Sequence, residues 1–322
     1  MEVRDGRNVR FVSMSISNIK EASNMKKVLV TGGTIFVSRY IAEYYVAKGC
    51  DVYVLNRNSK PQPEGVTLIE ADRHNLGELL RDYCFDVVID TAYNAYDVDT
   101  LLDALGEYKD YILISSSAVY PEYVTQPFKE EDILAENKYW GKYGTDKIEA
   151  ESTLLMRDSN AYILRPPYLY GPMNNVYREA FVFDCAMANR KFYLPQEGKM
   201  QMQFFHVYDL CRFIDIILEN KPQQHIFNVG NKETISARKW VEICYEIAGK
   251  QADFVNVYGE IEQRNYFSFY NYEYYLDVSK QYELMKDVKS LNEGLTEAYN
   301  WYINNMDKVN KKPYMDYIDG NM

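Results

Sequence analysis

The 322-residue sequence has few of the residues that metal sites and disulfide frameworks need. Its three histidines, His74, His206 and His225, lie far apart, and its five cysteines form no C-x-x-C pair. An odd, scattered set of cysteines is typical of reduced thiols and disfavours zinc. We therefore expect a cytoplasmic protein with no metal site.

Long apolar runs and an excess of basic residues are also lacking. No stretch approaches the roughly 18 apolar residues that a membrane span needs. The 36 Lys and Arg residues are outnumbered by 47 Asp and Glu, for a net charge of −11. Nucleic-acid binding needs a basic face, so this acidity disfavours it. We expect neither a membrane nor a nucleic-acid partner.

The two ends of the sequence are polar. Residues 1–24 contain no apolar segment of a signal peptide, and Met25 stands directly before the first apolar run. We interpret residues 1–24 as a disordered tail or as an over-long translation, and residues 307–322 as a C-terminal tail. The chain between them is long enough for one large domain or two intimate ones.

Between the tails, short apolar runs alternate with helical patterns. This alternation predicts an α/β fold, a Rossmann-type doubly wound parallel sheet over residues 25–165. After that the pattern loosens, so residues 166–306 are predicted to form a smaller C-terminal α/β substrate lobe, partly interleaved with the first domain. We expect strands at 27–31, 51–55, 66–70, 86–90, 111–115 and 161–165, and helices at 36–48, 76–83, 97–107, 143–157, 176–190, 207–219, 236–248 and 293–305.

The first predicted strand ends in the glycine turn Thr31-Gly32-Gly33-Thr34. Such a turn lets backbone N–H groups approach a pyrophosphate at a helix N-terminus. Two further glycines are usual in this kind of site, and here Ile35 and Ser38 replace them. Ser38 is small enough for close packing, whereas Ile35 puts a branched side chain where backbone should meet phosphate. A structural turn without a ligand stays an alternative.

The end of the second strand bears on the choice of cofactor. An acidic residue there holds the ribose of NAD, and an arginine accommodates the extra phosphate of NADP. The segment after this strand has no acid but contains Arg57 and Lys60. We therefore slightly favour NADP(H) over NAD, with a solvated loop charge as the alternative for Arg57. Asp72, after the third strand, is placed to reach an adenine or to cap its own loop.

Tyr143 and Lys147 are four residues apart at the start of a predicted helix, and positions i and i+4 share a helix face. A tyrosine with a pKa of ~10 is a poor base near neutrality. A neighbouring ammonium and a positive nicotinamide favour the phenolate, so we expect a lowered pKa for Tyr143. Tyr143 could then exchange a hydroxyl proton while a hydride moves. By spacing alone, a surface helix pair is the stronger interpretation.

Further motifs favour the proton-transfer site over the surface helix pair. A stretch S-S-x-x-V-Y begins at Ser115, Y-G-x-x-K-x-x-x-E runs from Tyr143 to Glu151, and R-P-P-Y-L-Y-G-P begins at Arg165. Together with the glycine turn, these motifs resemble the extended short-chain dehydrogenases/reductases of the NAD-dependent epimerase/dehydratase family over roughly residues 26–300. The resemblance implies a Rossmann domain, NAD(P), a nucleotide-linked sugar substrate and a homodimer formed through a four-helix bundle.

The resemblance also implies site residues. The catalytic trio would be Ser116, Tyr143 and Lys147. Candidate cofactor contacts are Gly32, Gly33, Thr34, Ile35, Phe36, Asn56, Arg57, Asp72, Arg73, Thr91, Ala92, Tyr93, Lys147 and Pro166. Candidate substrate contacts are Ser117, Tyr168, Asn174 and Arg264.

One departure from the family's sequence pattern limits the reactions that we expect this protein to catalyse. Its sugar 4,6-dehydratases have an Asp-Glu pair where this chain has Ser117 and Ala118, which disfavours dehydration. The sequence therefore predicts an NAD(P)-dependent epimerase or ketoreductase that acts at a hydroxyl or keto carbon of a sugar. The alternative is a catalytically idle protein that senses NAD(P) or binds RNA. The departures from the glycine pattern motivate that alternative. A related branch of the family, which includes chloroplast stem-loop RNA-binding proteins, also has a T-G-G-T-x-F turn with a bulky residue at the second glycine, so Ile35 need not abolish cofactor binding.

Overall fold

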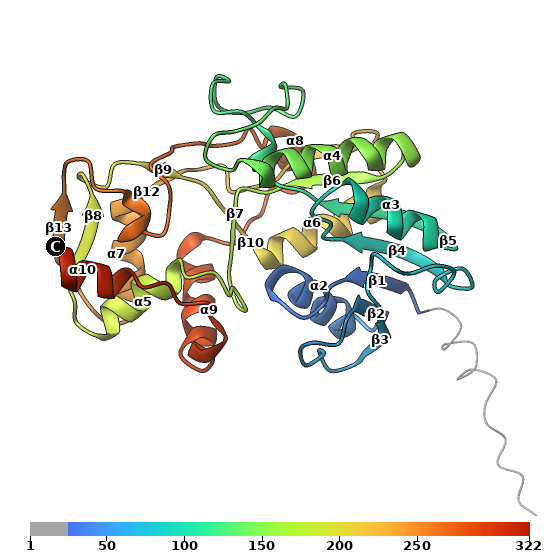
Figure 1. The fold of residues 1–322 in the computed structure, drawn as a ribbon, viewed down its shortest axis with the longest axis horizontal. Helices are drawn as coiled ribbons and strands as arrows, with labels where there is room; N and C mark the ends of the chain where they lie inside the picture. The colour runs from blue at the N-terminus through green and yellow to red at the C-terminus, as the bar shows by residue number, and fades with distance from the viewer. Residues whose placement is uncertain (1–24) are drawn as a thin grey trace, which may run out of the picture.

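The computed structural model describes residues 25–322, so the expected tail at 1–24 lies outside the described residues. Its centre is a seven-stranded parallel sheet with strand order β11-β6-β5-β4-β1-β2-β3 (Figure 1). This order confirms the predicted α/β doubly wound fold. The strands are β1 (Lys27–Thr31), β2 (Asp51–Asn56), β3 (Val66–Glu70), β4 (Cys84–Asp90), β5 (Glu107–Ile114), β6 (Tyr162–Arg165) and β11 (Ile226–Asn228).

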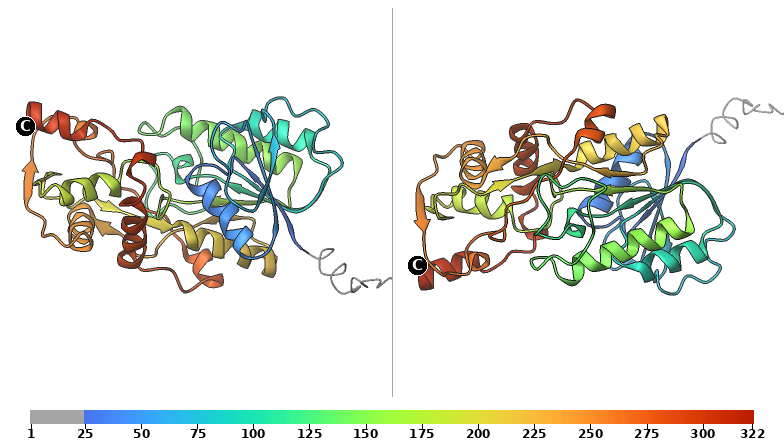
Figure 2. Two further views of the ribbon diagram at one scale, coloured as in Figure 1. Left: turned by 90° about the horizontal axis from the view of Figure 1, so that it is seen from below. Right: turned by 90° about the horizontal axis from the view of Figure 1, so that it is seen from above.

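Helices cover both faces of this sheet (Figure 2). Helices α3 (Ala95–Ala104) and α4 (Lys142–Arg157) pack on one face, and α2 (Phe36–Ala47) and α6 (Val207–Asn220) pack on the other. Successive strand residues point to opposite faces. Val28 and Val30 accordingly belong to the core under α2 and α6, while Leu29 belongs to the core under α3 and α4. Because both faces are covered, the strands are almost wholly apolar.

A second lobe follows the sheet (Figure 1). Since β11 and α6 come after residue 165 but complete the sheet, the chain passes between the two lobes more than once. The remaining strands are β7 (Tyr168–Tyr170), β8 (Phe192–Pro195), β9 (Gln201–Met202), β10 (Phe204–His206), β12 (Ile235–Ser236) and β13 (Phe254–Val257). The remaining helices are α5 (Glu179–Met187), α7 (Ala237–Ile247), α8 (Ser279–Leu284), α9 (Leu291–Tyr302) and α10 (Tyr314–Asn321), with 3-10 turns at Ser117–Val119, Gln263–Asn265 and Met306–Lys308.

Three expectations about the elements need correction. Residues 76–83 form turns and not a helix, since Gly77 has a φ of +51° that ends helical geometry. The helix expected at 97–107 ends at Ala104, because β5 already begins at Glu107. The expected C-terminal tail contains the helix α10, in which Tyr314 and Ile318 are buried in the core of the second lobe.

Candidate functional site

A tight glycine turn joins β1 to α2 at the carboxyl edge of the sheet. Gly32 and Gly33 have φ values of +82° and +76°, in the left-handed region that favours glycine. A Cβ on Gly33 would lie 2.5 Å from Cγ1 of Val54, so the turn lies directly against β2. The turn and Thr34 therefore bring backbone to the N-terminus of α2, where the helix dipole favours an anion.

The fold accommodates both departures from the glycine pattern. Ile35 is the N-cap of α2 with a φ of −134°, a conformation that does not require glycine, and its side chain is exposed. Ser38 is buried, and its hydroxyl donates to the carbonyl of Ile35 at 3.0 Å. Ile35 and Phe36 line a cavity of about 630 Å³ that Lys308 reaches from the C-terminal segment. A phosphate-sized ligand has room beside the turn.

The residues after β2 differ in what they can still bind. Asn56 donates to the carbonyl of Gly32 at 2.6 Å and to Oε1 of Gln62 at 3.0 Å, so its amide holds the glycine turn against β2. Arg57 and Lys60 are exposed, and within residues 25–322 neither forms an ion pair. Their positive charges remain available to an anionic ligand. The side-chain amide of Asn56 is already hydrogen-bonded within the fold, so these bonds compete with its predicted contact to the cofactor.

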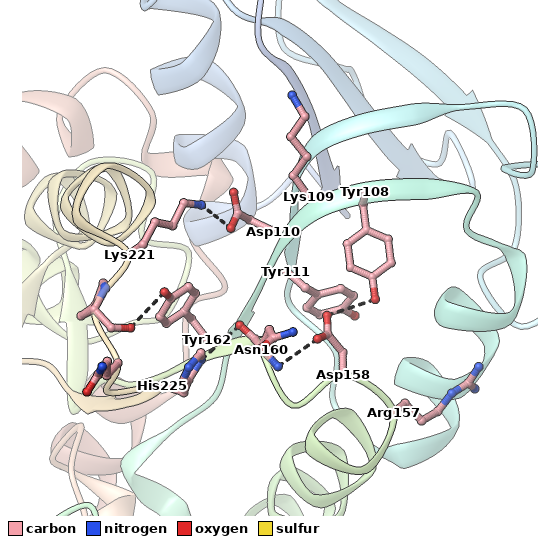
Figure 3. A pocket seen from close by; sticks show the side chains of 12 residues that line it. Tyr108, Lys109, Asp110, Tyr111, Arg157, Asp158, Asn160, Tyr162, Lys221 and His225 are labelled. Atoms are coloured by element: carbon pink, nitrogen blue, oxygen red, sulfur yellow. Dashed lines mark hydrogen bonds and ion pairs between the residues drawn. The ribbon is translucent and has the colours of Figure 1, made fainter.

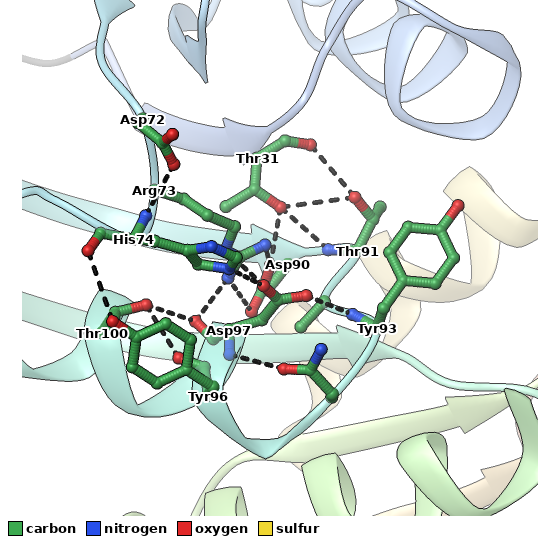
Figure 4. Close-up of polar contacts among 12 residues, drawn as sticks. Thr31, Asp72, Arg73, His74, Asp90, Thr91, Tyr93, Tyr96, Asp97 and Thr100 are labelled. Carbon is green, nitrogen blue, oxygen red and sulfur yellow. Dashed lines mark hydrogen bonds and ion pairs between the residues drawn. The ribbon is translucent and has the colours of Figure 1, made fainter. Parts of the chain in front are cut away.

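Asp72 and Arg73 follow β3 and have different surroundings (Figure 4). Asp72 is exposed and accepts the N–H of His74 at 3.0 Å, which matches the loop-capping alternative. Arg73 donates to both oxygens of the fully buried Asp90 at 3.2 Å and lies 3.5 Å from Oδ1 of Asp97. Two carboxylates already balance its guanidinium, so Arg73 has a structural role that competes with the predicted contact to a cofactor.

Asp97 connects this charge network to the segment Thr91-Ala92-Tyr93, which was predicted to line the cofactor channel. Asp97 accepts the N–H of Tyr93 at 2.8 Å and a hydrogen bond from His74 Nε2 at 2.6 Å. Burial acts to raise the pKa of Asp97, but these bonds and the charge of Arg73 hold it below its ordinary value. The carboxylate therefore fixes the backbone that follows β4.

The three predicted catalytic residues lie together at the same edge of the sheet. Ser116 follows β5, and its hydroxyl lies near enough to Tyr143 to act on the pKa of the phenol. Tyr143 and Lys147 share one face of α4, and both contact Tyr93, with ring centres 6.3 Å apart for the tyrosine pair and the ammonium 5.4 Å from the Tyr93 ring centre. A Cβ on Gly144 would lie 2.5 Å from the carbonyl oxygen of Ala118, so α4 packs directly on the serine loop.

The protonation of Tyr143 differs from the expectation. Loss of solvation raises its pKa, and the nearby hydroxyl of Ser116 and the positive charge of Arg178 only partly oppose that shift. Lys147 does not contribute the expected lowering. The prediction of a lowered pKa for Tyr143 is therefore wrong for the groups that the protein itself supplies.

Lys147 has other partners. Its ammonium donates to the carbonyls of Ala92 at 2.6 Å and Ile114 at 2.9 Å, at the ends of β4 and β5. Burial lowers the pKa of Lys147 to about 8, although Asp90 and Glu151 act to raise it. Two carbonyl contacts hold this side chain in place between the strands and α4.

A buried ion pair behind the trio, which we did not predict as part of the site, fixes α4. Arg165 Nη2 donates to Glu151 Oε2 at 2.6 Å, and both side chains are at most 3% exposed. Ser115 donates to the same carboxylate, and Arg165 also donates to the hydroxyl of Tyr120 at 2.8 Å. The i+8 spacing from Tyr143 to Glu151 was the signal in the sequence, since it places both on one side of the helix.

The structure gives structural partners to three more of the candidates. The N–H of Ser117 donates to the carbonyl of Pro166 at 2.9 Å, and its hydroxyl lies near enough to the buried Tyr274 to act on the pKa of that phenol. Asn174 is buried, donates to Oε1 of Glu179 at 2.9 Å and thereby shapes the loop before α5. Their polar groups are therefore used within the fold. The predicted substrate roles of Ser117 and Asn174 compete with these structural roles, and Pro166 takes part through its backbone carbonyl.

Tyr168 and Arg264, the other two substrate candidates, lie in one cavity of about 230 Å³. Arg178 and Lys312 line the same cavity and were not predicted. The guanidinium of Arg178 lies 4.8 Å from the centre of the Tyr168 ring. No spacing in the sequence marks Arg178, and Lys312 falls in the segment that we expected to be a tail.

Another cavity, of about 560 Å³, lies at the amino ends of β5 and β6, away from every predicted site residue (Figure 3). Its polar groups are largely paired with one another. Lys221 pairs with Asp110, and the Tyr108 hydroxyl donates to Asp158 at 3.1 Å. These paired groups therefore stabilise the amino end of the sheet and leave few polar groups for a ligand.

Over residues 25–322, no cluster of three or more His, Cys, Asp or Glu side chains is arranged to hold a metal ion. No helix in that part of the chain is long and apolar enough to span a membrane.

Known proteins resemble this chain in sequence, and solved structures resemble it in fold. The chloroplast stem-loop binding protein of 41 kDa b from Arabidopsis thaliana is 28% identical over 306 residues, which cover 87% of this chain and 80% of that protein. A probable GDP-L-fucose synthase 1 from Oryza sativa subsp. japonica is 24% identical over 64% of this chain and 66% of its own length.

Among solved structures, a putative epimerase from Burkholderia cenocepacia superimposes with a TM-score of 0.73 at 21% identity, covering 86% of this chain and 97% of that one. A UDP-glucuronic acid 4-epimerase from Bacillus cereus gives a TM-score of 0.68 at 20% identity, covering 86% and 99%. The model of the NAD-dependent epimerase/dehydratase family matches residues 28–230. Since this match takes in more than half of the chain, the protein belongs to the NAD-dependent epimerase/dehydratase family.

Proposed function

We propose that this protein is an NAD(P)-dependent epimerase or ketoreductase that transfers a hydride reversibly at a hydroxyl or keto carbon of a sugar. The observation that supports this is the convergence of Ser116, Tyr143 and Lys147 at the sheet edge that also holds the glycine turn. Proton transfer and hydride transfer need these two sites side by side.

Each member of the trio has a distinct task in this proposal. Tyr143 exchanges a proton with the substrate oxygen, and Ser116 hydrogen-bonds the same oxygen. Lys147 holds the ribose hydroxyls of the cofactor from its place between the ends of β4 and β5. Because burial raises the pKa of Tyr143, this phenol keeps its proton near neutrality and is set to donate it to a carbonyl.

NAD(P) would be held by the glycine turn, by the segment from Thr91 to Tyr93 and by Lys147. Its nicotinamide supplies the hydride donor or acceptor. Arg57 and Lys60 support the slight preference for NADP(H), since both are exposed beside the turn and lack ion-pair partners within residues 25–322. A 2′-phosphate would provide that partner.

Two further parts of the proposal concern the reaction and the substrate. Dehydration is disfavoured, because Ser117 and Ala118 are buried and neither can act as a general acid. A nucleotide-linked sugar is supported by structural neighbours solved with UDP-glucuronic acid and UDP-glucose. We also propose a homodimer formed through the outer faces of α3 and α4, and a cytoplasmic location, in keeping with five cysteines that are all free.

The test is a fluorescence titration of the full chain with NADPH and with NADH. Saturable binding in the micromolar range is expected, with NADPH the tighter ligand. On a substrate that is turned over, Tyr143→Phe should reduce kcat by about 10²–10⁴-fold while cofactor affinity is kept. A folded protein that binds neither nucleotide would overturn the proposal, as would full activity in the variant.

A second candidate function is RNA binding without turnover, and the relation to the Arabidopsis stem-loop binding protein favours it. The net charge of −11 opposes it. A gel-shift titration with a structured RNA at physiological salt separates the two candidates. Saturable binding of RNA with no affinity for either nucleotide would favour this second function.

A further inference from the structure

The cavity beside the glycine turn has walls from both lobes. Residues 34–36, at the start of α2, form one wall. The opposite wall comes from the C-terminal part of the chain, through Trp301 of α9 and through Asp307, Lys308 and Asn310. In Figure 1, α9 is accordingly the helix of the second lobe that faces α2. A ligand at the glycine turn therefore has the C-terminal segment on its other side.

Contacts within the second lobe hold this C-terminal segment in place. The N–H of Asn310 donates to the carbonyl of Asn175 at 2.9 Å, and Val309 is buried in the core of the second lobe. A 3-10 turn over Met306–Lys308 precedes them, and the N–H of Lys308 donates to the carbonyl of Asn305 at 3.0 Å. An anchored backbone, and not a free chain end, therefore carries Lys308 to the cavity.

The charges that line the cavity differ in how they are paired. Arg39 pairs with Glu43 on α2 at 2.7 Å, so these two charges balance each other. Nζ of Lys308 donates to the neutral side chain of Asn305 at 2.6 Å, and within residues 25–322 Lys308 forms no ion pair. Asp307 is exposed and also lacks an ion-pair partner in that part of the chain. The ammonium of Lys308 therefore keeps its charge for a ligand, and the neighbouring carboxylate of Asp307 opposes an anion.

The placement of the positive charges suits a diphosphate. At a glycine turn of this kind, the diphosphate of a dinucleotide lies at the N-terminus of the following helix, which here is the wall formed by residues 34–36. Lys60 lines the same cavity, so two unpaired lysines outnumber the one unpaired carboxylate of Asp307. An ammonium donates strong, charge-assisted hydrogen bonds to phosphate oxygens.

We propose that Lys308 binds the diphosphate of a dinucleotide held at the glycine turn, so that the C-terminal segment closes the cofactor site from the second lobe. This inference rests on the proposed function and adds to it a residue outside the Rossmann part of the chain. NADPH and NADH share the diphosphate, so Lys308 contributes equally to the binding of both. Arg57 differs from it, because the partner proposed for Arg57 is the 2′-phosphate of NADPH alone.

The test uses the full chain, with fluorescence titration of NADPH and NADH and calorimetric titration of ADP-ribose. Lys308→Gln should raise the Kd for all three about tenfold, because each contains the diphosphate. Asp307→Asn should lower each Kd about two- to threefold, because it removes a neighbouring negative charge. Lys312→Gln is the matched control and should change none of them, since Lys312 lies in the same segment but does not line this cavity.

Unchanged Kd values in Lys308→Gln would overturn this inference. An effect on NADPH alone would do so as well, because it would assign Lys308 to the 2′-phosphate. So would weaker binding by both Lys308→Gln and Asp307→Asn, since damage to the segment would then explain the loss. Melting temperatures without ligand show whether each variant is folded.

The same titrations separate this inference from the proposed function. Cofactor binding that is equal in wild type and in Lys308→Gln refutes this inference alone. Binding of ADP-ribose that depends on Lys308, without binding of NADPH or NADH, refutes the proposed function alone. A folded wild-type protein that binds none of the three probes refutes both.

Discussion

The buried ion pair between Arg165 and Glu151 should be essential to the stability of α4 in the fold, and Glu151→Gln tests this. The Glu151 carboxylate accepts hydrogen bonds from Arg165 Nε at 3.0 and 3.2 Å, from Nη2 at 2.6 Å and from the hydroxyl of Ser115. A neutral amide leaves the Arg165 guanidinium charged and only 2% exposed. Breaking a buried pair from one side costs about 3–5 kcal/mol.

Calorimetry and urea unfolding measure this loss. At about 2 °C per kcal/mol for a large domain, the melting temperature of Glu151→Gln should fall by roughly 6 °C or more. Glu149→Gln is the matched control on the same helix, because Glu149 is exposed, and it should stay within about 0.5 kcal/mol of wild type. Replacing both charges, with Glu151→Leu and Arg165→Met, should recover part of the loss, since no unpaired charge remains.

The reasoning would be refuted by a loss below about 1 kcal/mol in Glu151→Gln, which is the scale of an ordinary neutral hydrogen bond. A double variant less stable than Glu151→Gln would also contradict it, because the stability would then come from the charges themselves and not from avoiding an isolated one.

Three other variants test the glycine turn, the buried lysine and the cofactor preference. Gly33→Ala should destabilise the protein by about 2 kcal/mol more than Gly49→Ala in urea unfolding, because both positions have φ near +77° but only Gly33 is crowded, by Val54 at 2.5 Å. Burial lowers the pKa of Lys147 from 10.5 to about 8, so the unfolded chain binds more protons between these values. Wild-type stability relative to Lys147→Met should therefore rise by up to ~3 kcal/mol from pH 8 to 10.5, and a flat difference would contradict the burial. Arg57→Ala should raise the Kd for NADPH about tenfold and leave that for NADH unchanged in fluorescence titrations, and equal effects on both would exclude a 2′-phosphate contact.

The sequence by itself determined the sheet and the outline of the proposed catalytic site. Runs such as Val28-Leu29-Val30 are apolar at every position because both faces of the sheet are covered, so they mark buried parallel strands. The glycine turn and the i, i+4 pair of Tyr143 and Lys147 are local features whose geometry depends on a few neighbouring residues. Local patterns of this kind can be recognised without knowledge of the rest of the fold.

Only the tertiary structure decided which charges remain free to bind a ligand. Arg73 and Arg178 are both single arginines in loops, yet Arg73 meets Asp90 across the sheet while Arg178 meets aromatic rings and no carboxylate. Lys312 faces the same cavity as Arg178 because α10 packs through Tyr314 against Phe181. These partners are far apart in the sequence. Contacts between such distant residues leave no periodic pattern in a single sequence from which they could be predicted.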